Sequence, residues 1–338
     1  MFWEGLLKNS EGAGMFSDDL LNISARAAGE LAMMIKEGKK ISDRGYQEEL
    51  LREILLHLEH QLKAVEVKKR QGPKRVFVFL PENVPVIPFQ LVPLISSYEL
   101  DVTFKAPSSE KTFYEILGEK TGFKFVWISH GEAFRQASAN EFVIGFGGKE
   151  LGEKLKALGV PYRFFGPKFS LAFVESDDLY LVMEDALSFD GEACLAPVFI
   201  FMEEPDFELA WEALERASVR RPPQLSFNKD IFEYATSFLL YYSKSFRIGE
   251  DFALFYIDRF PHLIPQRTVF LLKGSEEEAI RFLGERSDMV QAIITRRNPM
   301  VLMERTSASL VLPPGRSQLP PLSWFFQKGL TLANFFSL

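Results

Sequence analysis

The sequence predicts an α/β protein in which short apolar strands alternate with helices in two successive units, preceded by a pair of amphipathic helices. Three observations support this. Strand-like runs are rich in Val, Ile and Phe, the segments between them suit helices, and the alternation occurs twice along the 338 residues. Such alternation is typical of right-handed crossovers and a mainly parallel sheet covered on both faces. We therefore expect two Rossmann-like, three-layer α/β/α domains behind an N-terminal helical lead-in.

The lead-in is predicted from two helical patterns. Residues 17–37 place apolar side chains three and four positions apart behind a Ser–Asp capping signal, and Gly38 follows as a stop. A second pattern begins near Ser42 and Asp43 and continues to Val65. These two helices account for most of the first 65 residues or so.

The two α/β units are predicted from the runs that follow. The first has strands at 75–80, 101–105, 124–128 and 141–145, with helices at 88–98, 109–121, 132–139 and 149–158. The second has strands at 170–174, 198–202, 253–257, 268–272 and 291–295, with helices at 178–188, 207–217, 229–242 and 276–283. We expect domains at 1–165 and 166–315, and a C-terminal segment, 316–338, that returns toward the first domain.

Composition and charge exclude several classes of function. Lys and Arg number 39 against 46 Asp and Glu, and no basic stripe could follow a phosphate backbone, so no nucleic acid partner is expected. No apolar run reaches the ~18 residues of a membrane span, and the N-terminus lacks a basic signal region. The single cysteine predicts a cytoplasmic protein without disulfides. Four scattered histidines offer no metal site: His57, His60, His130 and His262.

The stretch that carries chemistry surrounds this cysteine, Cys194. Residues 187–197, LSFDGEACLAP, place it on a Gly-containing turn between a predicted helix and a predicted strand. A thiol exposed at such a strand edge could carry an acyl group, with backbone N–H groups holding the oxyanion. The alternative is that a lone cysteine is a small buried apolar residue.

Further motifs occur in a fixed order around the cysteine block: LPENVP (80–85), FKAPSSE (104–110), GFGGKELG (145–152) and FGPKFS (165–170). This order resembles the aldehyde dehydrogenase superfamily. The acyl-CoA reductase (LuxC-type) branch, which supplies fatty aldehyde in bacterial luminescence, is similar at FDGEACLAP (189–197), QRTVF (266–270) and QLPPLSW (318–324). The resemblance covers roughly residues 75–330. It implies an aldehyde dehydrogenase-like fold with a nicotinamide cofactor domain within 1–165 and a catalytic domain at 166–315.

The resemblance also implies two catalytic residues. Cys194 would take the acyl group from a thioester, and hydride from the cofactor would then release an aldehyde. The amide of Asn83 would join the Cys194 backbone N–H in binding the oxyanion. An alternative for Asn83 is a helix N-cap just ahead of Val84 and Pro85, a position that asparagine often occupies.

The cofactor site is implied by two of the motifs. Lys105, at a strand end, would bind the adenosine ribose, and Ser108 and Ser109 beside it would tolerate a 2′-phosphate. NADP(H) is therefore favoured, and NAD(H) stays open. Gly147 and Gly148 would face the pyrophosphate at a helix N-terminus. Plain chain reversal for the glycines and a solvated lysine at the strand end are the alternatives.

One departure from the superfamily bears on the reaction. Phe164 stands where hydrolytic members carry the glutamate that activates water, so release of a carboxylic acid is not expected. The expected function is NAD(P)H-dependent reduction of a fatty acyl-CoA. An acyl phosphate reductase and a noncatalytic scaffold stay open, as does a homo-oligomer. Polyanionic CoA would need a basic cleft mouth, for which the candidates are Lys168, Arg220, Arg221 and Arg267.

Overall fold

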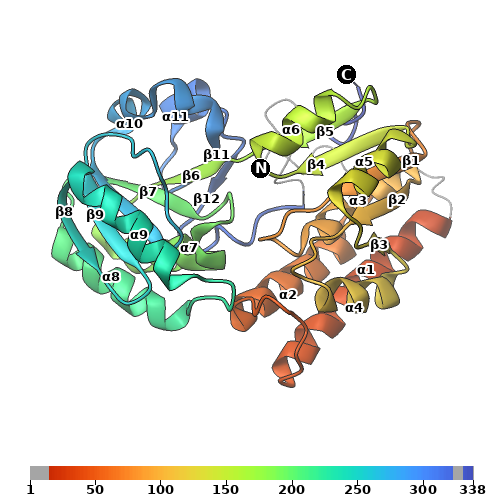
Figure 1. Cartoon of the computed structure of the whole chain (residues 1–338), viewed down its shortest axis with the longest axis horizontal. Coiled ribbons are helices and arrows are strands. Elements are labelled where there is room, and N and C mark those ends of the chain that lie inside the picture. Colours follow the sequence, from red (N-terminus) through yellow and green to blue (C-terminus); the bar gives the residue numbers. More distant parts are fainter. Residues whose placement is uncertain (1–14, 323–329, 338) are drawn as a thin grey trace.

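The computed structural model describes residues 15–322 and 330–337 and contains two separate β-sheets surrounded by helices (Figure 1). Sheet A is parallel throughout, with the strand order β3-β2-β1-β4-β5. Sheet B has the order β12-β11-β6-β7-β10-β9-β8 and is parallel except for the antiparallel pair of β8 and β9. The predicted α/β class is confirmed.

Sheet A contains β1 (Arg75–Phe79), β2 (Asp101–Lys105), β3 (Lys124–Val126), β4 (Phe142–Phe146) and β5 (Tyr162–Phe165). Its connections contain α3 (Ile87–Tyr98), α4 (Thr112–Thr121), α5 (His130–Ser138) and α6 (Lys149–Lys156). Four of these strands and all four helices agree with the predicted ranges to within a few residues. The sequence did not predict β5, because this edge strand is only partly buried along its whole length and carries no clear alternation.

Sheet B contains β6 (Phe169–Phe173), β7 (Pro197–Met202), β8 (Ser243–Ile248), β9 (Ala253–Ile257), β10 (Thr268–Lys273), β11 (Val290–Ile294) and β12 (Leu310–Leu312). Its helices are α7 (Leu179–Leu187), α8 (Phe207–Arg220), α9 (Lys229–Leu239), α10 (Glu276–Leu283) and α11 (Met300–Arg305). Short 3₁₀ turns lie at η2 (Ser176–Asp178), η3 (Ser188–Gly191), η4 (Leu240–Tyr242) and η5 (Gly284–Met289). The edge strands β8 and β12 and the short α11 were not predicted.

The lead-in contains α1 (Met15–Lys36) and α2 (Glu48–Ala64). The predicted stop at Gly38 is confirmed, since this residue has a φ of 71°. The predicted start of the second helix is wrong. Asp43 instead caps α4: its carboxylate accepts hydrogen bonds from the backbone N–H of Lys111 and of Thr112, at 3.0 and 2.8 Å. The capping signal was genuine, but it serves a helix distant in the sequence.

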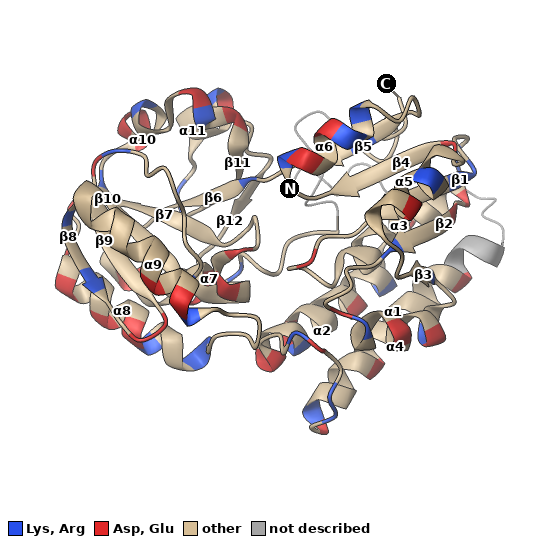
Figure 2. Cartoon of the chain, in the orientation of Figure 1, with Lys and Arg blue, Asp and Glu red and all other residues tan. Residues whose placement is uncertain are grey.

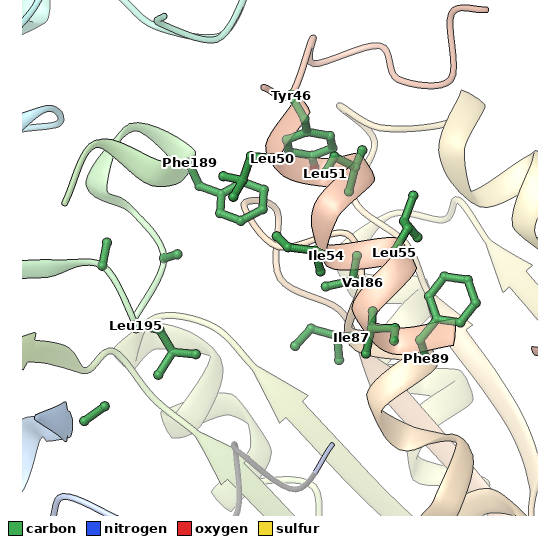
Figure 3. Packing of buried hydrophobic residues seen from close by; sticks show 14 of the residues in the cluster. Tyr46, Leu50, Leu51, Ile54, Leu55, Val86, Ile87, Phe89, Phe189 and Leu195 are labelled. Carbon is green, nitrogen blue, oxygen red and sulfur yellow. The ribbon is translucent and has the colours of Figure 1, made fainter. Parts of the chain in front are cut away.

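Helix α2 packs between the two sheet units (Figure 3). On one side its apolar residues face the segment that begins α3, and on the other they face the turn before Cys194. Tyr46, just before α2, lies edge-on to the ring of Phe189 with centroids 6.0 Å apart. Because one apolar cluster spans the lead-in and both sheets, the molecule has a shared core at this junction.

The end of the described chain lies beside sheet A. The hydroxyl of Tyr98 donates to the carbonyl of Leu332 at 2.7 Å, and Nε of Arg163 donates to the carbonyl of Phe335 at 3.0 Å. The domain division at 165 and 315 stays a prediction, because the shared core crosses it. None of the helices in the described residues is long and apolar enough to cross a membrane.

Candidate active site

Five of the seven predicted site residues line one cleft of about 750 Å³ at the carboxyl edge of sheet A. This edge is where ligands of parallel sheets commonly bind. Cys194 reaches the same cleft from the turn before β7 in sheet B. The cleft therefore joins the two sheets. The site residues that line it are Asn83, Lys105, Gly147, Gly148 and Cys194.

The two remaining predicted residues, Ser108 and Ser109, are exposed, and neither is among the described residues that line the cleft. Pro107, just before them, does line it. Ser109 lies at the rim, where its Oγ accepts a hydrogen bond from Nη1 of Arg44 at 3.4 Å. The serines thus stand at the end of the cleft that Lys105 occupies.

A tight reversal of the chain between α7 and β7 brings Cys194 to the cleft. Phe189, Asp190 and Gly191 have φ values of 51°, 58° and 74°, in the left-handed region that non-glycine residues rarely adopt. A Cβ on Gly191 would lie 3.2 Å from the carbonyl oxygen of Ala186. Glycine is therefore required there by both conformation and space.

A buried ion pair holds this reversal. Oδ1 of Asp190 accepts from Nη1 of Arg267 at 3.1 Å, and both side chains are at most 1% exposed. The carbonyl of Asp190 accepts the backbone N–H of Arg267 at 2.8 Å, and its carboxylate accepts the backbone N–H of Gln224 at 3.2 Å. These bonds satisfy a carboxylate that would otherwise be buried at a large energetic cost.

The thiol of Cys194 is half-buried. Burial raises its pKa to about 12, while its own backbone N–H and the charge of Lys168 act in the opposite direction. The carbonyl of Cys194 accepts a hydrogen bond from Oγ of Ser170 at 2.7 Å. A pKa in this range favours the protonated thiol at neutral pH, and the hydrogen bond from Ser170 holds the backbone that carries it.

Asn83, in the segment between β1 and α3, connects that segment to the cysteine turn. Its Nδ2 donates to the carbonyl of Glu192 at 2.6 Å. An amide NH₂ has two N–H donors, so this bond leaves one for a ligand. The alternative role as N-cap is wrong, because α3 begins at Ile87 with Val86 at the cap position.

The two glycines at the start of α6 differ in their surroundings, since a Cβ on Gly147 would lie 3.0 Å from the Leu151 side chain. Gly148 is the N-cap of α6 with a φ of −73°, which any residue adopts. A Cβ built on it would meet no described atom within 4 Å. Neither conformation nor packing therefore requires glycine at position 148. A pyrophosphate that lies close against the helix N-terminus would require it.

At the end of β5, Phe165 lines the cleft and Phe164 does not. Phe164 points to the other side, where a Cβ on Gly152 would lie 2.7 Å from its ring. Phe164, the residue expected at the position of the water-activating glutamate, therefore does not face the cleft, whereas its neighbour Phe165 does. The described carboxylates that line the cleft come from other segments: Glu82, Glu150 and Glu192.

Of the four basic residues proposed for the cleft mouth, only Lys168 lines the cleft. Arg220 and Arg221 pair with Glu184 at 3.4 and 3.5 Å, and Arg267 is fully buried. Figure 2 shows Lys and Arg interspersed with Asp and Glu along the outer helices, including α8 and α10. The other basic residues that line the cleft are Arg44, Lys105, Lys154 and His130.

Part of the QLPPLSW motif, residues 318–324, lies beside Cys194. Gln318 and Pro320 line a small cavity of about 20 Å³ whose wall also includes Cys194. The carbonyl of Pro320 lies 3.2 Å from Nε2 of His57 on α2. Trp324, which completes the motif, lies outside the described residues. Most other residues of this wall are apolar: Ile54, Val84, Val86, Phe189, Ala193 and Leu195.

Among residues 15–322 and 330–337, no group of three His, Cys, Asp or Glu side chains is placed to hold a metal ion. No family model matches the sequence, and no curated protein gives a significant match.

Solved structures resemble the chain over most of its length. An NAD-dependent aldehyde dehydrogenase from Sinorhizobium meliloti has a TM-score of 0.64 at 12% identity, covering 89% of this chain and 75% of that one. An acetylating aldehyde dehydrogenase from Geobacillus thermoglucosidasius has 0.62 at 13% identity, with 90% and 83% covered. An oxidoreductase from Marinobacter aquaeolei has 0.67 at 11% identity, with 96% and 87% covered. The chain therefore has an aldehyde dehydrogenase-like fold.

Proposed function

We propose that this protein is an NAD(P)H-dependent acyl-CoA reductase that carries its acyl group on Cys194. The observation that supports this most directly is the convergence of Cys194, Asn83 and the Gly147–Gly148 turn on one cleft in an aldehyde dehydrogenase-like fold. The likeness to an acetylating aldehyde dehydrogenase adds support for an activated acyl substrate.

In this proposal the cofactor lies along the carboxyl edge of sheet A. Gly147, Gly148 and the N-terminus of α6 would hold the pyrophosphate, and Lys105 would hold the adenosine ribose. The bound nicotinamide would supply the hydride that reduces the acyl carbon. Lys105 is half-buried, and desolvation lowers its pKa.

Chemistry at the cysteine begins with attack of Sγ on the thioester carbonyl. The new Sγ–C bond forms as the C–S bond to CoA breaks, and CoA leaves as a thiolate that takes up a proton. Asn83 and the Cys194 backbone N–H would hold the oxyanion, and loss of one such donor typically costs about 10² to 10³ in rate. The Sγ–C bond then breaks as the aldehyde is released. Overall, acyl-CoA, NAD(P)H and a proton give aldehyde, CoA and NAD(P)⁺.

The surroundings of the thiol suit this reaction. The β5 residue that lines the cleft, Phe165, has no carboxylate that could direct water at the acyl group, and the carboxylates that line the cleft come from other segments. The charge of Lys168 favours the thiolate that must attack.

One observation favours a noncatalytic binding role as a second candidate. Burial raises the pKa of the Cys194 thiol, and a protonated thiol is a poor nucleophile. A scaffold would bind a nicotinamide cofactor without becoming acylated.

Intact-protein mass spectrometry distinguishes these functions. The protein is incubated without cofactor with acyl-CoAs of several chain lengths, and the adduct is located by peptide mapping. We expect an acyl adduct on Cys194 that disappears when NADPH or NADH is added, and Cys194→Ala should abolish the adduct while cofactor affinity stays within a few-fold. A parallel incubation uses an acyl phosphate, and an adduct from that donor alone would identify a different activated substrate. Cofactor binding without any adduct would identify the noncatalytic role.

A further inference from the structure

Glu110, the acidic residue that follows Ser108 and Ser109 in the sequence, is turned away from the cleft. Glu110 is fully buried, and its carboxylate accepts hydrogen bonds from Oγ of Ser42 at 2.6 Å and from the backbone N–H of Phe113 at 3.1 Å. Acidic side chains in such positions bind the free ribose hydroxyls of NAD. Here the bonding capacity of the carboxylate is used by the protein itself.

The same carboxylate builds the loop that carries Arg44. It accepts the backbone N–H groups of Asp43 and Arg44, each at 3.1 Å. The loop connects α1 to α2 and presents the Arg44 side chain, which is 9% exposed, to the cleft beside Lys105 and Pro107. Glu110 thus adds no carboxylate to the ribose site, where Glu82 lines the cleft, and it orders the loop that brings the Arg44 guanidinium there.

The contacts of Arg44 leave room for an anion. Its Nη1 and Nη2 donate to the hydroxyls of Ser109 and Ser226 at 3.4 and 3.2 Å. Its carboxylate neighbours are Glu82 at 3.4 Å and Glu192 at 3.8 Å. Both distances exceed the 2.7–2.9 Å that is typical of a charge-assisted hydrogen bond. Its Nε is buried and has no hydrogen-bond partner within the described chain, so the contact to an anion falls to Nη1 and Nη2.

We propose that Arg44 binds the phosphomonoester of an adenosine ribose and so favours ligands that carry this phosphate over those that lack it. The inference rests on the proposed function, because it assigns Arg44 to the same cleft. A guanidinium presents a planar fork of donors that matches phosphate, and Lys105 and the Ser109 hydroxyl lie at the same end of the cleft. Two proposed ligands carry this group: NADP(H) at the ribose 2′-position and CoA at the 3′-position.

The test measures binding, by fluorescence or calorimetric titration, in the full chain. If Arg44 binds the phosphate of the cofactor, wild-type protein binds NADPH more tightly than NADH. Arg44→Gln then lowers the affinity for NADPH by tenfold or more, while the affinity for NADH changes little. If Arg44 binds the 3′-phosphate of CoA, the same variant reduces the difference in affinity between CoA and dephospho-CoA. Arg44→Lys, which keeps the charge without the fork, should give an intermediate loss. Arg75→Gln, at the exposed amino end of β1, is the matched control and should change none of these affinities.

A wild-type measurement avoids dependence on a folded variant. Adenosine 2′-monophosphate or 3′-monophosphate should displace the bound dinucleotide or CoA at lower concentration than adenosine does. Equal effects of Arg44→Gln on phosphorylated and unphosphorylated ligands, or no effect on either, would overturn the inference while leaving the proposed function intact. Wild-type protein that binds no nicotinamide dinucleotide would instead refute the proposed function, and the CoA comparison would then decide the role of Arg44.

Discussion

Alkylation of Cys194 should depend on pH well above the range in which an ordinary thiol titrates. Burial raises the pKa of this thiol from its ordinary value of 9.0 to about 12, against the smaller influences of its own backbone N–H and Lys168. The chain has a single cysteine, so uptake of iodoacetamide by the protein reports on Cys194 alone.

The size of the effect follows from the two pKa values. Only the thiolate reacts, and a pKa of about 12 in place of 9.0 lowers its fraction roughly a thousandfold at neutral pH. Below the pKa, the thiolate fraction rises about tenfold for each pH unit. We therefore expect the alkylation rate of the folded protein to rise steeply beyond pH 9, whereas the rate in denaturant levels off there.

The assay follows the mass increase of the intact protein with time, across the pH range over which the fold persists. Lys168→Met should slow alkylation several-fold at pH values where Lys168 is protonated, because it removes a charge that favours the thiolate, and the effect should fade as the pH passes the lowered pKa of Lys168. Lys111→Met, at an exposed site, should not slow it. A folded-state rate that levels off near pH 9 would refute the reasoning. Steric shielding alone lowers the rate but does not move the pH of its plateau.

Two further predictions concern the glycine turn and the buried ion pair. Gly148→Ala should lower the unfolding temperature only slightly, because an added Cβ meets no described atom and only the N-cap preference for glycine is lost, but it should weaken dinucleotide binding in titrations. Gly131→Ala, also without close contacts, is its control for binding. Equal affinities for the two variants would count against the pyrophosphate assignment. Arg267→Gln should lower the free energy of unfolding in urea by about 3–5 kcal/mol, because it leaves Asp190 buried without its cation. The exposed pair broken by Arg247→Gln should cost about 1 kcal/mol or less, and similar costs for both would contradict the argument from burial.

The sequence by itself determined most of the secondary structure and the candidate chemistry. Strand β2 and helix α10 occupy their predicted ranges, 101–105 and 276–283, because apolar periodicity and capping are local properties of the chain. The missed strands β5, β8 and β12 all lie at sheet edges, where burial is incomplete and the apolar pattern is weak. The motif order also identified Cys194, Asn83 and the glycine turn, which the cleft brings together.

Only the tertiary structure decided what surrounds these residues. Asp43 caps α4 rather than α2, and Phe165 rather than Phe164 faces the cleft, because each depends on which neighbour packs against the chain. Arg44 gave no local signal. It enters the cleft because Glu110, distant in the sequence, organises its loop, and because α2 is held between the two sheet units. Periodicity predicts which face of an element is buried, whereas the partner of a buried carboxylate depends on how distant segments pack together.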